Sequence, residues 1–276
     1  MIKIIALLIS LGLSFITTYK IDANGVFNNT IIYIAFFLVY VICIVALFFV
    51  SALALSIGID KNKKRDTYSK AYHKIYTFYD GIVLKTFGVK LKVEGMDKLP
   101  KDTNFLVVQN HVSNVDPLAL NYALKKNELI FVSKASLFNI PFFGKMIQKI
   151  GYVKLYRNNS REDALEMIRG TKFLENGYCS MAIYPEGSRN KNYKENKLQE
   201  FRPGAFSPAT KNKLPIVFTS ISGTEKINDG LIIKPHKVVI KVVRVLNYDD
   251  YKEMNTKEIS ELAYKEIYDS FEYCIK

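Results

Sequence analysis

Two uncharged apolar stretches near the start of the chain restrict what it can fold into. The first runs from Ile4 to Tyr19 and the second from Ile31 to Ile59. A helix needs about 20 apolar residues to cross a bilayer, so the second stretch is long enough and the first is short. We expect residues 1–60 to form two transmembrane helices arranged as a hairpin. The alternative is a signal peptide followed by one span, although no convincing small-residue cleavage site precedes Gly25.

The charge of the chain lies almost entirely outside these stretches. The sequence carries 39 Lys and Arg against 26 Asp and Glu, a formal net charge of +13. The basic cluster Asp60–Arg65 follows the second stretch, and the positive-inside rule places it, with the rest of the chain, on the cytoplasmic side of the cell membrane. A basic surface suits anionic lipid of the inner leaflet or an acidic carrier protein. Nucleic acid is not expected as a partner, because no zinc-finger spacing, arginine-rich block or RNA-binding signature occurs.

Neither the cysteines nor the histidines indicate a metal centre. Cys43, Cys179 and Cys274 are widely separated and odd in number, which predicts no disulfide framework and no metal knuckle. The three histidines also lie far apart, without the spacing of zinc ligands. We therefore expect no metal and no bound cofactor.

Residues 61–90 are predicted to form a juxtamembrane amphipathic helix. Between Asp66 and Lys85, Tyr, Phe and Ile recur at a spacing close to helical. Tyr is favoured at the headgroup level of a membrane. A core helix of the following domain is an equally good interpretation of the same pattern.

Residues 91–276 are predicted to form a domain of the α/β class, with a mixed, largely parallel sheet of about seven strands flanked by helices. Strand-like and helix-like segments alternate there. The predicted strands are Val89–Val93, Phe105–Gln109, Leu129–Ser133, Tyr152–Leu155, Cys179–Tyr184, Ile216–Ile221 and Val238–Val245. The predicted helices are Pro117–Leu124, Phe142–Ile150, Glu162–Asn176, Ala205–Lys211 and Glu258–Tyr273. Ser160 is the expected N-cap of the third of these, and Gly177 follows its end.

One polar turn follows the second predicted strand. It reads Asn-His-Val-Ser-Asn-Val-Asp-Pro over Asn110–Pro117. His111 and Asp116 would not face each other on a regular helix. A turn can bring the carboxylate onto one imidazole nitrogen, which leaves the other nitrogen as a base. The alternative is that Asp116 merely caps the next helix and that His111 is a satisfied polar residue; the H-x-x-x-x-D spacing alone does not decide.

Further stretches along the chain bear on the choice between these two interpretations of His111 and Asp116. They are Gly151–Arg157, Tyr184–Asn190 with the letters YPEGSRN, Phe201–Gly204 and Leu214–Val217, together with Val132–Leu137 and Pro141–Gly144. Taken in order with the turn at His111, they resemble the glycerophospholipid acyltransferase family, and most closely its 1-acylglycerol-3-phosphate O-acyltransferase branch. The resemblance covers roughly Leu91 to Val245. This chain departs from the family pattern in having Phe218 for a second proline, Tyr184 for a phenylalanine and Ser188 for a threonine.

The resemblance implies transfer of an acyl chain from acyl-CoA or acyl carrier protein to the sn-2 hydroxyl of 1-acylglycerol-3-phosphate (lysophosphatidate), giving phosphatidic acid in phospholipid biosynthesis. His111 would act as general base and Asp116 would orient it, with no covalent acyl-enzyme, since the chain lacks G-x-S-x-G. Glycerol-3-phosphate or another lysophospholipid is an alternative acceptor. A non-catalytic, membrane-attached lipid-binding protein is a more remote alternative.

The same resemblance gives a set of expected substrate-binding residues. Arg157 and Arg189 would bind the acceptor phosphate through charge-assisted hydrogen bonds, and the backbone amides near Gly187 and Ser188 would add donors. Glu186 would hold an arginine or a glycerol hydroxyl. The remaining two members of the set are Lys134, for phosphate or carrier contact, and Asn110.

Overall fold

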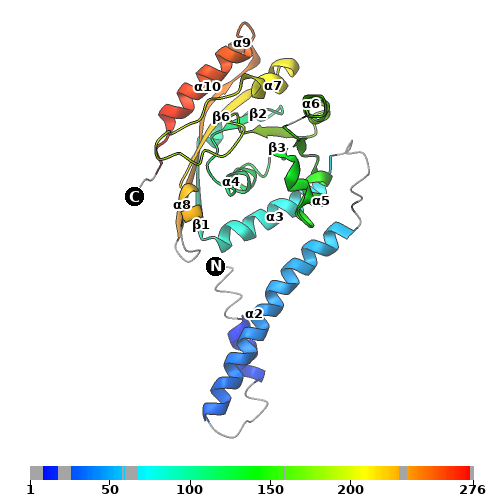
Figure 1. The fold of residues 1–276 in the computed structure, drawn as a ribbon, viewed down its shortest axis with the longest axis vertical. Coiled ribbons are helices and arrows are strands. Elements are labelled where there is room, and N and C mark those ends of the chain that lie inside the picture. Colours follow the sequence, from blue (N-terminus) through cyan, green and yellow to red (C-terminus); the bar gives the residue numbers. More distant parts are fainter. Residues whose placement is uncertain are drawn as a thin grey trace. The chain divides into compact units, whose positions relative to one another are not determined.

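The computed structural model describes residues 9–17, 26–57, 59, 68–157, 159–229 and 235–273. The chain divides into two compact units, Met1–Asp60 and Lys61–Lys276. The described elements of the first unit are helical, whereas the second unit contains a sheet with helices on its faces (Figure 1).

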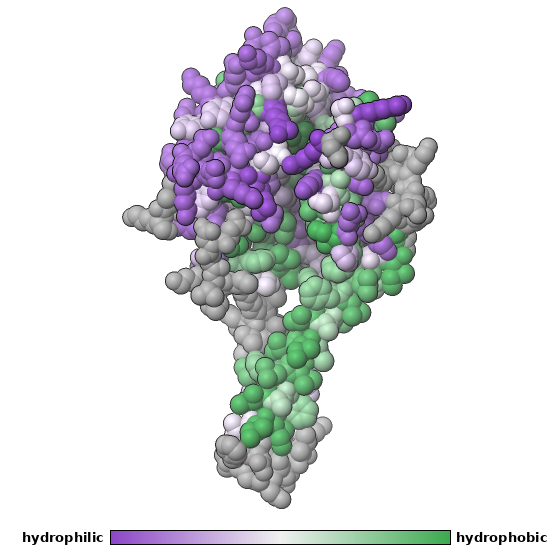
Figure 2. Space-filling view, viewed as in Figure 1, coloured by the Kyte–Doolittle hydropathy of each residue, from purple (hydrophilic) through white to green (hydrophobic). Residues whose placement is uncertain are grey.

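The first unit is built on one long helix, α2 (Val26–Ile57). Among the described residues, only its segment Thr30–Ile57 is long and apolar enough to cross a membrane. Ile42 and Leu47 are 66% and 68% exposed, and Figure 2 shows most of the surface of α2 as hydrophobic. Such a surface is unfavourable in water and suited to lipid, where a helix satisfies its own backbone groups.

The first predicted span is described only in part. Residues 9–17 are helical, and the Thr17 hydroxyl lies 2.8 Å from the Tyr40 phenol of α2. The flanking residues and the cluster Asp60–Arg65 lie outside the described ranges, so the hairpin and the signal peptide both stay predictions.

The second unit is organised by a seven-stranded sheet of order β1-β7-β6-β2-β5-β3-β4. The strands are β1 (Val89–Glu94), β2 (Leu106–Gln109), β3 (Leu129–Lys134), β4 (Val153–Leu155), β5 (Ser180–Ile183), β6 (Ile216–Ser222) and β7 (His236–Leu246). All pairs are parallel except β6 with β7. The central strands β2 and β5 are buried along their whole length, as strands covered on both faces must be. The predicted mixed, largely parallel sheet is confirmed.

Helices cover both faces of this sheet (Figure 1). The α-helices are α3 (Lys70–Thr86), α4 (Asp116–Ala123), α5 (Phe143–Ile150), α6 (Ser160–Glu175), α7 (Ser207–Asn212), α8 (Glu225–Asp229), α9 (Tyr248–Tyr251) and α10 (Thr256–Ser270). Three 3-10 helices are η1 (Met96–Lys98), η2 (Ala135–Asn139) and η3 (Pro203–Phe206). Helices α3, α4 and α5 pack together on one face, while α6, α7 and α10 lie on the other.

Helix α3 is a core helix of the second unit. It packs against α4, α5 and β1, and it buries Tyr76, Asp80 and Leu84. Of the two interpretations of residues 61–90, the structure therefore supports the core helix. A further contact of this helix with lipid headgroups stays a prediction.

Three helix boundaries differ from the sequence prediction. The N-cap of α6 is Asn159 rather than Ser160, because the Asn159 side chain accepts the backbone N–H of Glu162 at 3.2 Å. The helix predicted at Ala205–Lys211 is split into η3 and α7, with a proline in the first turn of each. Helix α10 ends at Ser270, since Phe271 is extended with φ −146° and ψ 163°.

Candidate active site

The carboxyl ends of five parallel strands meet at one edge of the sheet. Strands β6, β2, β5, β3 and β4 run in the same direction. The ends of β6, β2, β5 and β4 are followed by Thr224, His111, Glu186 and Arg157, respectively, and β3 ends at Lys134. Loops at this edge are where α/β sheets place their ligands. The topology therefore gathers the predicted site residues from segments that are far apart in the chain.

The turn at His111 brings the imidazole and the carboxylate together as predicted. His111 Nδ1 lies 2.8 Å from Asp116 Oδ2. The Asp116 side chain is fully buried, whereas that of His111 is 16% exposed. A carboxylate only accepts hydrogen bonds, so Nδ1 carries the proton and Nε2 keeps its lone pair. The pair has the geometry of a general base with an orienting carboxylate.

Asp116 is held by more than the imidazole. Oδ2 also accepts the backbone N–H groups of Val112 at 2.7 Å and Ser113 at 2.8 Å. Oδ1 accepts the hydroxyl of Thr224 at 2.5 Å. Thr224 follows β6 and is fully buried; sequence reasoning missed it. Nothing near Thr224 in the sequence links it to a position 108 residues earlier, so only the neighbouring placement of β2 and β6 reveals the contact.

Glu186 braces the backbone of the His111 turn. Its Oε1 accepts the His111 N–H at 2.6 Å, and its Oε2 accepts the Gln199 N–H at 3.0 Å. Burial raises the pKa of the Glu186 carboxyl to about 7, although the two N–H donors act in the opposite direction. In this structure each of its oxygens accepts one backbone amide, so the expected contact of Glu186 with an arginine or a substrate hydroxyl stays a prediction.

An aromatic stack supports the imidazole from the side. The rings of His111 and Tyr184 are 4.1 Å apart and inclined by 21°. Phe131 lies behind Tyr184 at 6.3 Å with a similar inclination of 24°. The Tyr184 hydroxyl is buried and has no hydrogen-bond partner among the described residues. The stacked ring of Tyr184 restricts rotation of the imidazole, in addition to the restriction that its hydrogen bond with Asp116 imposes.

Arg157 reaches the predicted phosphate-binding turn in an unusual backbone conformation. Its φ of 68° lies in the left-handed region, where a side chain other than glycine is disfavoured. Asp163 in the first turn of α6 holds it there by accepting the N–H groups of Tyr156 at 2.5 Å and Arg157 at 2.9 Å. The guanidinium donates a hydrogen bond to the Gly187 carbonyl. Arg157 and the turn at Gly187 are thus brought together.

Two more cations surround this turn. Gly187 has φ 73°, and a Cβ there would lie 2.8 Å from the Arg202 guanidinium, so this position requires glycine. Arg202 belongs to the Phe201–Gly204 stretch but was not predicted as a site residue. The Arg189 guanidinium has no ion pair or hydrogen bond within the described part of the chain. These positions form a basic, solvent-accessible turn.

The other predicted binding residues have different surroundings. The Ser188 hydroxyl donates to Gln199 Oε1 at 3.2 Å, and Lys134 is exposed at the end of β3. Asn110 is fully buried. Its amide nitrogen donates to the Ile221 carbonyl at 2.9 Å and to the Tyr273 phenol at 3.1 Å, and its oxygen accepts the Ile221 N–H at 2.8 Å. In this structure the Asn110 side chain links the chain after β2 to β6, and its expected contact with substrate stays a prediction.

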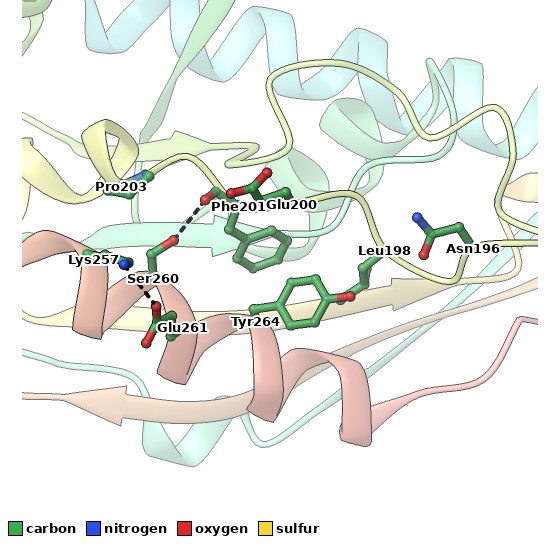
Figure 3. A pocket seen from close by; sticks show the side chains of 9 residues that line it. All are labelled: Asn196, Leu198, Glu200, Phe201, Pro203, Lys257, Ser260, Glu261 and Tyr264. Atoms are coloured by element: carbon green, nitrogen blue, oxygen red, sulfur yellow. Dashed lines mark hydrogen bonds and ion pairs between the residues drawn. The ribbon is translucent and has the colours of Figure 1, made fainter.

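No group of three or more metal-ligating side chains occurs among the described residues. A separate hollow of about 510 Å³ lies between α10 and the chain around Phe201 (Figure 3). There the Ser260 hydroxyl donates to the Phe201 carbonyl at 3.0 Å. None of the predicted site residues lines this hollow.

The fold and the site agree with the comparison to known families. A family model described as Acyltransferase matches residues 90–222, the segment that carries the sheet edge and all of the predicted site residues. The chain is therefore an enzyme of the acyltransferase class.

Individual similar proteins indicate which acyltransferases the chain resembles. A 1-acyl-sn-glycerol-3-phosphate acyltransferase of Borreliella burgdorferi is 27% identical over 62% of this chain and 69% of its own length. A chloroplastic enzyme of the same name from Arabidopsis thaliana is 33% identical over 57% of this chain, but the match spans only 43% of that longer protein. The crystal structure of the 1-acyl-sn-glycerophosphate acyltransferase PlsC from Thermotoga maritima shares the fold, with a TM-score of 0.62, 23% identity, and coverage of 81% and 86% of the two chains. Residues 90–222 thus belong to the Acyltransferase family, and the chain is similar to 1-acyl-sn-glycerol-3-phosphate acyltransferases.

Proposed function

We propose that the chain transfers an acyl group from a thioester to the sn-2 hydroxyl of 1-acylglycerol-3-phosphate, giving phosphatidic acid. The observation that carries this proposal is the 2.8 Å contact between His111 Nδ1 and Asp116 Oδ2, which leaves Nε2 available at a partly exposed sheet edge. The names of the relatives from Borreliella burgdorferi and Arabidopsis thaliana support the choice of acceptor.

The proposed mechanism needs no covalent acyl-enzyme. Nε2 of His111 takes the proton of the acceptor hydroxyl as its oxygen attacks the thioester carbonyl. Asp116 stabilises the imidazolium that forms. When the carbon–sulfur bond breaks, the thiolate takes the proton from Nε2, which restores the neutral histidine. A positioned base of this kind contributes about 10²–10⁴-fold to a rate.

The basic turn would hold the phosphate of the acceptor. Arg189 is the first candidate, because its guanidinium has no ionic partner in the described part of the chain. Arg157 lies against the Gly187 carbonyl and can turn its remaining N–H donors outward. The amides of Gly187 and Ser188 and the exposed Lys134 complete the proposed set. Planar guanidinium groups bind a phosphomonoester through paired hydrogen bonds.

The proposed setting is a membrane whose cytoplasmic leaflet supplies the acceptor. The span Thr30–Ile57 would anchor the chain, and the acceptor and the product are themselves held in lipid by their acyl chains. The net charge of +13 favours contact with anionic lipid and with an anionic donor, which is coenzyme A or acyl carrier protein.

Purified full-length protein in detergent tests the proposed base. We expect His111→Ala and Asp116→Asn to lower kcat by about 10²–10⁴-fold with lysophosphatidate and labelled acyl-CoA or acyl carrier protein. His236→Gln is the matched control, since His236 begins β7 outside the site, and it should keep wild-type kcat. A His111→Ala enzyme within about tenfold of wild type would reject the proposal.

A panel of acceptors tests the substrate. Lysophosphatidate should be acylated well above glycerol-3-phosphate and above lysophospholipids whose phosphate carries a headgroup. Arg189→Ala should raise the KM for lysophosphatidate by about tenfold or more, on the order expected for a lost charge-assisted hydrogen bond. An unchanged KM would remove Arg189 from the phosphate site, and a preference for another acceptor would replace the substrate assignment.

A further inference from the structure

The segment that follows α10 returns to the site. Helix α10 ends at Ser270, and the extended residue Phe271 directs the chain away from the helix axis. Tyr273 is buried, and its phenol oxygen accepts a hydrogen bond from Asn110 Nδ2 at 3.1 Å. Asn110 immediately precedes His111. The Acyltransferase family match ends at residue 222, so this contact comes from a part of the chain outside it.

Asn110 links the two strands that carry the base and its support. The Asn110 side-chain amide bonds to Ile221 as the backbone of a neighbouring strand would: it donates to the Ile221 carbonyl and accepts the Ile221 N–H. Ile221 lies three residues before Thr224, whose hydroxyl binds Asp116. Tyr273 completes the hydrogen bonding of the Asn110 amide, so it acts on the link between β2 and β6.

The same segment also fastens the loop that touches the His111 backbone. The rings of Tyr193 and Tyr273 meet edge to face at 5.2 Å. The Lys197 ammonium lies 4.9 Å from the Phe271 ring centre and 2.8 Å from a Glu272 carboxylate oxygen. This loop in turn binds the site, because the Asn190 N–H donates to the His111 carbonyl at 2.7 Å.

We propose that Tyr273 is a positioning residue for His111, acting through Asn110 on one side and through the Tyr193 loop on the other. The inference rests on the proposed function in taking His111 as the base. Without the phenol, Asn110 keeps one acceptor for its amide nitrogen instead of two, and the backbone on which the imidazole is mounted gains freedom. A loss of alignment at the base lowers kcat more than it weakens substrate binding.

Burial raises the pKa of the Tyr273 phenol well above its usual value. The phenol therefore stays protonated throughout the pH range of the assay. Any change that a Tyr273 variant makes in the acidic limb of the pH–rate profile therefore comes from His111 or from Glu186, which binds the His111 N–H and has a pKa of about 7, and not from Tyr273 itself.

Two tyrosine variants separate positioning from simple stability. Tyr273→Phe removes one buried hydroxyl, and Tyr251→Phe removes another, which binds the Leu214 carbonyl at 2.6 Å at a distance from the site. We expect both to lower the melting temperature slightly. Only Tyr273→Phe should lower kcat, by about three- to tenfold, the range of one hydrogen bond, with acceptor KM changed less than about twofold and the acidic limb displaced.

Lys197→Gln provides the same test from the Tyr193 loop, should Tyr273→Phe fail to fold. It releases the loop from Phe271 and Glu272 and should lower kcat in the same direction. Wild-type kcat and pH profile in the folded variant would overturn the inference, and so would equal effects of Tyr251→Phe. If His111→Ala is inactive while Tyr273→Phe is normal, this inference alone fails; an active His111→Ala enzyme rejects the proposed function instead.

Discussion

Asp116 does more at the level of single residues than orient an imidazole. One buried carboxylate receives two backbone N–H groups, one hydroxyl and the His111 ring. Each buried donor left without an acceptor costs about 1–3 kcal/mol. Removal of the carboxylate therefore disorganises the whole turn, so the loss of activity in a variant such as Asp116→Asn includes a structural part.

Tyr184 provides a prediction in which two substitutions have opposite effects. Tyr184→Phe keeps the stacked ring and removes a hydroxyl that has no partner among the described residues. It should keep kcat within about twofold and raise the free energy of unfolding by about 1 kcal/mol. Tyr184→Leu removes the stack, worth about 0.5–1.5 kcal/mol, and should lower kcat up to about tenfold. Steady-state kinetics and denaturant unfolding measure both; equal kcat values for the two variants would argue against a role for the stack.

Glu186 gives a prediction about pH and stability. Its pKa of about 7 in the folded protein is higher than the usual value near 4.3 in an unfolded chain. The folded state thus binds this proton more tightly, and the resulting stabilisation is complete below about pH 4 and lost as pH rises to about 7. The difference corresponds to about 3–4 kcal/mol.

Comparison with Glu186→Gln isolates this contribution. The difference in unfolding free energy between wild type and variant, measured in detergent at several pH values, should move by a few kcal/mol in favour of the variant from about pH 4.5 to about pH 7.5. A difference that is independent of pH would mean that Glu186 titrates normally.

At the scale of elements, the start of α6 sets the conformation of Arg157. Asp163→Ala removes the acceptor that binds the N–H groups of Tyr156 and Arg157. We expect a loss of about 1–2 kcal/mol of stability, because left-handed backbone is retained only where surrounding contacts enforce it. The KM for lysophosphatidate should rise several-fold as Arg157 leaves the turn at Gly187.

Glu162→Ala is the control for this prediction. It removes a charge from the same helical turn, and with it the favourable interaction with the helix dipole, but it leaves the two amides bound. A KM that rises equally in both variants would assign the effect to the helix and not to Arg157.

For the whole molecule, the testable property is the side of the membrane on which the second unit lies. The basic residues after the second apolar stretch predict the cytoplasm. Lys191 is exposed on the loop beyond Arg189. In a variant with Cys43→Ser and Cys274→Ser, Lys191→Cys should react with an impermeant maleimide only after cells are permeabilised. Asn24→Cys, between the two apolar stretches, should react in intact cells if the chain forms a hairpin. Labelling of Lys191→Cys in intact cells would contradict the predicted orientation and place the second unit outside the cell.

Much of the fold could be predicted from the sequence because the relevant signals are local. Short apolar runs predicted all seven strands, and alternation with helices predicted a largely parallel sheet. The contact between His111 and Asp116 was also predicted: the length of the turn allows it, and the motifs elsewhere in the chain favoured it over a simple helix cap. Gly177 was placed correctly after α6 because a helix end in the left-handed region favours glycine.

The remaining features depend on which strands are neighbours. Thr224 meets Asp116 because β6 lies beside β2, and Asn110 is turned toward Ile221 and Tyr273 for the same reason. Glu186 meets the His111 amide because β5 is the other neighbour of β2. Hydrophobic periodicity predicts that a segment is a strand, but it does not predict which strand will pair with it. Any buried apolar run can pair with any other. The sequence by itself thus determined the seven strands and the turn that carries His111 and Asp116, and the order of strands in the tertiary structure decided which distant residues support that turn.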